Sequence, residues 1–311
     1  MRIIETTALS KEYGSRRALD GLSLSVEEGD IFGFLGPNGA GKTTTIRILS
    51  GLLAPTDGRA LLAGIDVTRH PQAIKRIVGV LPESQGYYDW MSGEEYLEYF
   101  ESLHGYPSPR SRARVLLNAV GLGERARTPV SNYSRGMRQR LGIARALVHS
   151  PKVLFLDEPS LGLDPRGQRE INALIKRLNR EEGITVFLCS HLLSEIEGLC
   201  TRYAIVREGR LVAEGDRAEL GARLGQSRRL RLEVSEPKRA IDLARVLKGV
   251  REAHLEGDAV VMDTEEEAPM AALIRILVSD GIEVYGARRT APSLEEIFFG
   301  LTEAEPAEVA T

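Results

Sequence analysis

A glycine-rich segment between a short apolar run and a helical pattern is the feature that most constrains the fold of this chain. The run Ile31–Leu35 leads directly into Gly36-Pro37-Asn38-Gly39-Ala40-Gly41-Lys42-Thr43, and residues 43–49 follow a helical spacing. Glycines let a backbone wrap closely around an anion, and the N-terminus of a helix adds positive partial charge. The segment therefore predicts a strand, a phosphate-binding loop and a helix.

The side chains of this loop have distinct expected roles. Lys42 is expected to reach the β- and γ-phosphates of a nucleotide, and the Thr43 hydroxyl to ligate Mg²⁺. The remaining residues of the predicted cradle are Gly36, Pro37, Asn38, Gly39, Ala40, Gly41 and Thr44.

Two carboxylates follow a second apolar run. Val153–Leu156 is continuously apolar, which is typical of a strand buried on both faces, and Asp157 and Glu158 come directly after it. Open α/β sheets bind ligands at the carboxyl ends of their strands. Asp157 is expected to hold Mg²⁺ and Glu158 to polarise an attacking water. Alone, the pair would be interpreted as a strand ending in solvated acids, but beside a phosphate loop a site is favoured.

Apolar runs alternate with helical patterns through the first two thirds of the chain. Further buried strands are predicted at 77–81 and 185–188, and helices at 135–149 and 165–181. This order is typical of an α/β domain with a largely parallel sheet. Alternation around residues 22–26 and a predicted hairpin at 203–214 add antiparallel β structure.

The pattern restarts after a Gly/Arg-rich stretch at 221–229. The predicted order is strand, helix, two strands, helix, strand and a final helix, at 230–234, 238–247, 251–255, 259–263, 269–279, 282–288 and 293–301. This order predicts a small α+β domain of the split-βαβ kind. We therefore predict a first domain over residues 1–224 and an accessory domain over 225–311.

Composition limits the expected partners. The 41 basic and 44 acidic residues give a net charge of −3 and are scattered along the chain, so no nucleic acid is expected as a partner. Cys189, one of two cysteines, lies in an apolar run and is interpreted as a buried thiol, which favours a reducing cytosol. No run of about 18 apolar residues occurs, so any membrane role is expected to need a partner.

A third motif carries a family resemblance. Tyr133-Ser134-Arg135-Gly136-Met137, directly before a predicted helix, resembles the signature motif of ABC ATPases, normally written LSGGQ. Tyr13 matches the family's adenine-stacking aromatic, Leu161–Asp164 is similar to its D-loop, and His191 matches its switch histidine. All of these stand in the family's order with the loop and the carboxylate pair, which match its Walker A and Walker B motifs.

The resemblance implies a P-loop ABC ATPase with a RecA-like mostly parallel sheet, an antiparallel β subdomain and a helical subdomain. It implies that two copies sandwich ATP with Mg²⁺, each nucleotide lying between the phosphate loop of one copy and Ser134 and Gly136 of the other, with Asp164 close by. Glu158, His191 and Lys42 would be the catalytic residues.

The same resemblance implies a separate integral-membrane permease, with the chain cytoplasmic and peripheral on the cytoplasmic face of the membrane. The accessory domain, with its closing segment from Ser293 to Thr302, is similar to the C-terminal extension in ATPases of multidrug and antibiotic exporters of the daunorubicin-resistance type. Export of a drug-like, lipid or polysaccharide substrate is therefore expected.

Two residues depart from the family pattern. Glu83 stands where the family usually has a glutamine, with Gln85 two places later, and Glu83 is expected near Mg²⁺. Arg135 replaces a glycine of the signature, which places a cation near the implied interface. Two alternatives stay open: a soluble non-transport ABC ATPase acting as a nucleotide-dependent clamp, and a nucleotide-binding module with negligible hydrolysis. An aromatic group around Tyr87 and Trp90 is interpreted either as core or as a docking site for the permease.

Overall fold

The computed structural model describes residues 1–105, 109–223, 228–245, 247, 249–264, 270–290 and 292–303. By its contacts the chain divides into two compact units, Met1–Glu214 and Gly215–Thr311. This division precedes the predicted boundary between residues 224 and 225, which lies outside the described residues.

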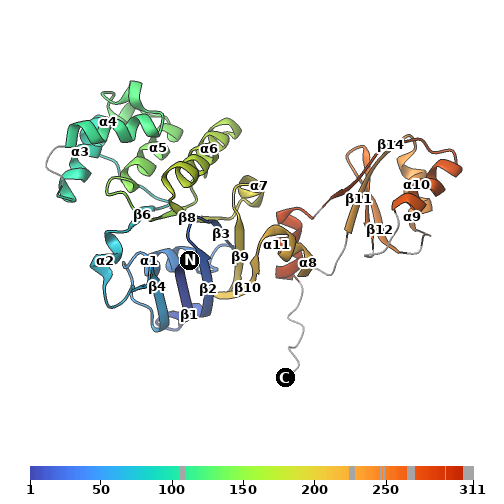
Figure 1. Cartoon of the computed structure of the whole chain (residues 1–311), viewed down its shortest axis with the longest axis horizontal. Helices are drawn as coiled ribbons and strands as arrows, with labels where there is room; N and C mark the ends of the chain where they lie inside the picture. Colours follow the sequence, from blue (N-terminus) through green and yellow to red (C-terminus); the bar gives the residue numbers. More distant parts are fainter. Residues whose placement is uncertain are drawn as a thin grey trace. The chain divides into compact units, whose positions relative to one another are not determined.

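A six-stranded sheet forms the centre of the first unit (Figure 1). Its strands, in spatial order, are β10 (Arg210–Gly215), β9 (Arg202–Arg207), β3 (Ile31–Leu35), β8 (Thr185–Ser190), β7 (Val153–Asp157) and β6 (Val78–Leu81). The strands from β9 to β6 pair in parallel, and β3, β7 and β8 are buried at every residue, as continuous apolar runs require. The predicted parallel sheet is confirmed.

A second, antiparallel sheet contributes the other part of this core. Its order is β2 (Arg16–Glu27), β1 (Arg2–Tyr13), β4 (Asp57–Leu62) and β5 (Ile65–Asp66). The alternating residues Leu22, Leu24 and Val26 are buried together with Phe32, Phe34 and Ile46 of β3 and α1 (Lys42–Leu49). Alternation of side chains along a strand turns one face toward the core, so this sheet covers the phosphate-loop helix.

Among its described residues, the first unit contains six further helices: α2 (Pro71–Lys75), α3 (Gly93–Leu103), α4 (Pro109–Ala119), α5 (Arg135–Ala146), α6 (Pro165–Glu182) and α7 (Leu193–Ile196). Short 3₁₀ turns occur at Gly123–Arg125 and Val130–Asn132. Figure 1 shows α3, α4 and α5 gathered into one lobe, and each contacts the other two. This lobe corresponds to the predicted helical subdomain.

Side chains fix where these helices begin. Ser92 and Glu95 form a capping box on α3, Ser134 caps α5, and Asp164 caps α6 ahead of a proline at its first position. The predicted helix at 135–149 is too long, because α5 ends at Ala146 and Ser150 takes a positive φ of 53° before Pro151. A residue before proline is disfavoured in helical geometry.

The second unit has the predicted split-βαβ order. Its elements are α8 (Arg217–Arg223), β11 (Arg228–Val234), α9 (Pro237–Arg245), β12 (Val250–Glu256), β13 (Ala259–Thr264), α10 (Met270–Ser279), β14 (Val284–Thr290) and α11 (Leu294–Glu303). The antiparallel sheet runs β12-β13-β11-β14, so β13 separates the two strands that α9 connects. Leu230, Leu232, Val260 and Met262 form the core with residues of α9 and α10.

Helix α8 belongs with α11 in this second unit. The Arg217 guanidinium donates to the Pro292 carbonyl, with Nη2 at 2.9 Å, just before α11 begins. Gly221 lies against Pro292 and Ile297, and Leu294 and Ile297 are fully buried. Two apolar residues of α11 are therefore buried.

Candidate functional site

The phosphate loop is shaped by glycines that no larger residue could replace. At Gly36, an added Cβ would lie 2.5 Å from the Val206 carbonyl oxygen, and at Gly41 it would lie 2.5 Å from a Leu19 methyl carbon. Gly41 also has a φ of 101°, which L-residues with a side chain rarely adopt. The loop thus depends on close packing against β9 and β2, and the helix α1 starts directly after it.

Lys42 is buried within this loop. Its ammonium donates to the Gly36 carbonyl at 2.6 Å and to the Pro37 carbonyl at 3.3 Å. Both bonds are charge-assisted, and they hold the Lys42 ammonium against the backbone of the loop.

A cleft of about 410 Å³ lies at the loop and at the carboxyl ends of the neighbouring strands. It is lined by Tyr13, Arg16, Ala18, Asn38, Gly39, Gly41, Lys42, Thr43, Thr44, Arg47, Glu83, Asp157, Glu158 and His191. Most of the predicted nucleotide, metal and catalytic residues thus meet in one place. Gly36, Pro37 and Ala40 belong to the same loop without lining the cleft.

The pair Thr43 and Asp157 joins the loop to the end of β7. The Thr43 hydroxyl donates to Asp157 Oδ2 at 2.9 Å, and Asp157 is only 3% exposed. Burial raises the pKa of the Asp157 carboxyl, and the negative charges of Glu158 and Glu83 raise it further, against the bond from Thr43. A cluster of hard oxygens with this excess of negative charge fits a divalent cation such as Mg²⁺.

Glu158 and His191 form the second pair in the cleft. His191 Nδ1 lies 2.8 Å from Glu158 Oε1, and the Glu158 backbone N–H donates to the Cys189 carbonyl at 3.0 Å. With Glu158 ionised, the bridging proton belongs to Nδ1, which leaves Nε2 as the ring nitrogen outside this bond. Glu158 has a φ of 53°, a left-handed conformation that costs a non-glycine residue about 1–2 kcal/mol. Such strain is typical of residues held in place for function.

Two arginines of the cleft were not predicted. Arg16 starts β2 opposite Tyr13, and its Nη2 lies 3.4 Å from the position that a Cβ on Gly39 would take. Arg47 comes from the last turn of α1. The signal for Arg16 was present in the sequence, since the turn Gly14-Ser15 after Tyr13 brings residue 16 back beside it.

The residues matched to the signature and the D-loop lie apart from the cleft. Ser134 Oγ accepts from the Met137 N–H at 3.2 Å, and Asp164 Oδ1 accepts from the Gly167 N–H at 2.8 Å. The Arg135 guanidinium lies flat on Gly162, where its Cζ would be 2.4 Å from an added Cβ. Ser134, Gly136 and Asp164 do not line the cleft of their own chain.

Glu83 and Gln85 point to different places. Glu83 lines the cleft, as predicted from its position after β6. Gln85 instead binds α5: its amide donates to Gln139 Oε1 at 3.2 Å, and its Oε1 lies 2.5 Å from the Tyr87 hydroxyl oxygen. Of these two side chains, the Glu83 carboxylate is therefore the one that shares the cleft with the candidate magnesium ligands Thr43 and Asp157.

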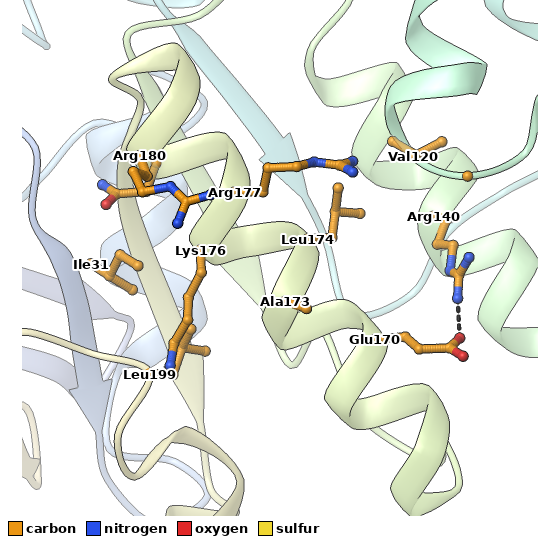
Figure 2. Close-up of a pocket in the computed structure, with 12 residues that line it drawn as sticks. Ile31, Val120, Arg140, Glu170, Ala173, Leu174, Lys176, Arg177, Arg180 and Leu199 are labelled. Carbon is orange, nitrogen blue, oxygen red and sulfur yellow. Dashed lines mark hydrogen bonds and ion pairs between the residues drawn. The ribbon is translucent and has the colours of Figure 1, made fainter.

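A larger hollow, about 900 Å³, surrounds the middle of α6 (Figure 2). Ile31, Lys176 and Leu199 lie on one side of this helix and Val120 and Arg140 on the other, with an ion pair between Arg140 and Glu170. None of the predicted site residues lines it. Size alone therefore does not identify the site, and the chemistry is concentrated in the smaller cleft.

Comparison with known proteins agrees with this geometry. The sequence model of the ABC transporter family matches residues 19–161. The bacitracin transport ATP-binding protein BcrA of Bacillus licheniformis is 38% identical over 96% of this chain and 97% of its own length. The daunorubicin/doxorubicin resistance ATP-binding protein DrrA of Streptomyces peucetius is 38% identical over 97% of this chain and 92% of its own length.

Solved structures agree as well. The dimeric structure of MJ0796, described as a bacterial ABC transporter cassette, superposes with a TM-score of 0.63 at 26% identity, covering 68% of this chain and 98% of that one. Within the residues that the structure describes, no helix combines the length and the apolar character that crossing a bilayer requires.

Matched at this identity along nearly its whole length, and with the cassette fold, the chain belongs to the ATP-binding proteins of ABC transporters.

Proposed function

We propose that this chain hydrolyses ATP to drive a separate membrane permease, and that two copies close on two nucleotides during each cycle. The single observation that carries the proposal is the cleft in which the phosphate loop, the Thr43–Asp157 pair and the Glu158–His191 pair meet. Phosphoryl transfer needs mainly positioning and charge neutralisation, and these groups supply both.

Each residue of the cleft has a proposed part. Thr43, Asp157 and Glu83 would hold Mg²⁺, which neutralises charge on the phosphates. Lys42 and the loop N–H groups would bind the phosphates, and Tyr13 would stack on the adenine. Glu158 would align the attacking water, and His191 would hold Glu158 in place.

The second nucleotide-binding surface is proposed to act across the dimer. Ser134 and Gly136 begin α5, whose free N–H groups favour an anion. Because they lie outside their own cleft, together with Asp164, they are available to a nucleotide held by residues 36–44 of the other copy. Dimeric MJ0796 supports this arrangement by likeness.

The relatives support export as the direction of transport. BcrA and DrrA are named for bacitracin transport and for daunorubicin/doxorubicin resistance, and both match this chain beyond the first unit. We infer a drug-like, lipid or polysaccharide substrate and a position on the cytoplasmic face of the membrane beneath the permease. We also assign ATP hydrolysis to residues 1–224 and an accessory role to 225–311. The non-transport clamp is not favoured, since these relatives serve transport and resistance.

The test compares wild type with Glu158→Gln by light scattering and phosphate release, with and without Mg²⁺-ATP. Wild type is expected to release phosphate, and Glu158→Gln to release almost none and to accumulate as an ATP-bound dimer. Glu182→Gln, a change at the exposed end of α6, is the matched control and should behave as wild type. A Glu158→Gln protein that hydrolyses ATP normally would refute the proposed role of this carboxylate.

A further inference from the structure

The segments that follow β7 and β8 are joined twice. The first junction is the hydrogen bond between Glu158 and His191 described above. The second junction is a hydrogen bond that the Ser160 hydroxyl donates to Glu195 Oε2. Ser160 is two residues after Glu158, and Glu195 is four residues after His191. Ser160 is only 2% exposed, so the donor end of this bond is shielded from water. The two bonds close a ring that contains both proposed catalytic side chains.

Glu195 is also held by α6. The Gln168 amide donates to Glu195 Oε1 at 2.5 Å, and the Asn172 amide donates to the Glu195 carbonyl at 2.7 Å. Residues four apart lie on one face of a helix, so Gln168 and Asn172 can both bind Glu195. Gln168 also donates to the Leu163 carbonyl at 3.2 Å. Glu195 thus joins α6, the segment after Glu158 and the segment after His191.

The segment after His191 has little support of its own. Helix α7 has only four residues and no side-chain cap, and an isolated single turn is unstable. The His191 side chain is 38% exposed, so packing alone does not fix its ring. Leu193 and Ile196 are buried and anchor the apolar side of the turn, whereas Glu195 supplies its polar attachment.

We propose that Glu195 is a positioning residue for ATP hydrolysis, which keeps His191 against Glu158 by fixing the backbone between residues 191 and 195. The inference rests on the proposed function and adds a residue that lies outside the nucleotide cleft. Because Glu195 does not line that cleft, its loss changes the rate of hydrolysis and leaves nucleotide binding intact.

The decisive variants are Glu195→Ala and Glu195→Gln in the full chain. Glu195→Ala removes both acceptor oxygens and is expected to lower kcat at least tenfold, with the KM for ATP changed less than twofold. Glu195→Gln keeps the shape and one acceptor oxygen, so it restores most of the rate. Ser194→Ala, at the exposed neighbouring position, is the control and keeps the wild-type rate.

Two further measurements separate positioning from mere stability. In a His191→Ala background, single-turnover phosphate release should fall less than twofold on adding Glu195→Ala, because Glu195 acts through His191. Hydrogen exchange at the His191 amide should quicken in Glu195→Ala at a temperature where the rest of the first unit is unchanged.

The outcomes distinguish this inference from the proposed function. An unchanged kcat in Glu195→Ala overturns the inference. The inference is also overturned if Glu195→Ala and Glu195→Gln lower kcat equally and each lowers the rate by the same factor in the His191→Ala background as in wild type. In both cases wild-type hydrolysis and ATP-dependent dimerisation of Glu158→Gln would stand. If wild type releases no phosphate, the proposed function fails first and the inference falls with it.

Discussion

The ionised Asp157 carboxylate destabilises the folded protein when no nucleotide or Mg²⁺ is bound. Its pKa is raised by burial and by the charges of Glu158 and Glu83, so the folded chain binds a proton more tightly than the unfolded chain does. As pH rises through the ordinary carboxyl range, the unfolded chain loses this proton first, and the folded state loses stability. This loss of folding stability is therefore present at neutral pH and absent at low pH.

We therefore expect Asp157→Asn to raise the unfolding temperature at pH 7 without nucleotide. The amide removes the buried charge and keeps an oxygen for Thr43. The gain should be about 2–4 °C for each kcal/mol recovered in a chain of this size. Calorimetry from pH 7 down toward pH 4 should show the advantage shrinking, while the stabilisation by Mg²⁺-ATP is lost in the variant. A variant less stable than wild type at every pH would contradict this account.

Arg135 and Gly162 are a coupled pair. The guanidinium occupies the space beside the Gly162 Cα, and Gly162 has a φ of 70°, so Gly162→Ala meets both a clash and a strained backbone. In an Arg135→Gly background only the strain is left. A double-mutant cycle should give a coupling of about 1 kcal/mol between the two sites, in stability or in ATP hydrolysis. Additive effects would show that the guanidinium does not rest on Gly162 in solution.

Local motifs made most of the cleft predictable at the residue scale. Lys42, Thr43 and Asp157 stand in patterns whose chemistry follows from a strand end and a helix start. Glu195 carries no such pattern, because its partners Ser160 and Gln168 are distant in sequence and meet it only after β7, β8 and α6 have packed. The direction of the Arg135 side chain was unpredictable for the same reason.

The aromatic group at the start of α3 contains two kinds of residue. The Tyr87 hydroxyl donates to the Arg138 carbonyl at 2.6 Å, and burial raises the pKa of this phenol above its usual range. Trp90 is 75% exposed and lies against Tyr88, with ring centroids 5.2 Å apart. Of the two interpretations of this group, Tyr87 fits core and Trp90 fits a surface contact.

Variants of these residues should separate the two roles. Tyr87→Phe removes the hydroxyl that binds the Arg138 carbonyl and should cost about 1–2 kcal/mol of stability. Trp90→Ala should change stability by less than about 0.5 kcal/mol, as exposed sites do, and weaken assembly with the permease. Chemical unfolding and co-purification with the permease measure the two effects. Intact assembly in Trp90→Ala would exclude this side chain as a docking residue.

The strands and helices that the sequence predicts are of the observed type because each has a strong pattern of its own, whereas helix ends depend on contacts. The sequence pattern continues the helix to residue 149, whereas residues 147–150 form a turn after α5. In this turn, His149 Nε2 lies 2.8 Å from the Val78 carbonyl oxygen of β6. Strand β14 likewise covers 284–290, two residues later than predicted, because its register is set by β11.

At the scale of the whole molecule, helix α8 at the start of the second unit determines where the chain should be cut. Leu220 of α8 is fully buried, and α8 contacts α11 within the second unit. A fragment ending at 224 keeps α8 but loses α11, whereas a fragment ending at 214 loses both. We expect the 1–214 fragment to unfold at a higher temperature and to associate less than the 1–224 fragment. The opposite order would assign α8 to the first unit.

The restart of the strand and helix pattern predicts two domains that meet between residues 224 and 225, whereas the contacts of the structure divide the chain after Glu214. Helix α8 accounts for the difference, because its partner lies about 75 residues later in the chain, where Arg217 meets Pro292. Contacts at such separations leave no local pattern to read.

The left-handed backbone at Glu158 has a consequence for laboratory evolution. Glycine at this position would relieve strain of about 1–2 kcal/mol, and it would also delete the proposed catalytic carboxylate. A library screened only for expression or heat resistance would therefore enrich inactive sequences at position 158. Selection for catalysis has to be applied in the same round to keep a glutamate there.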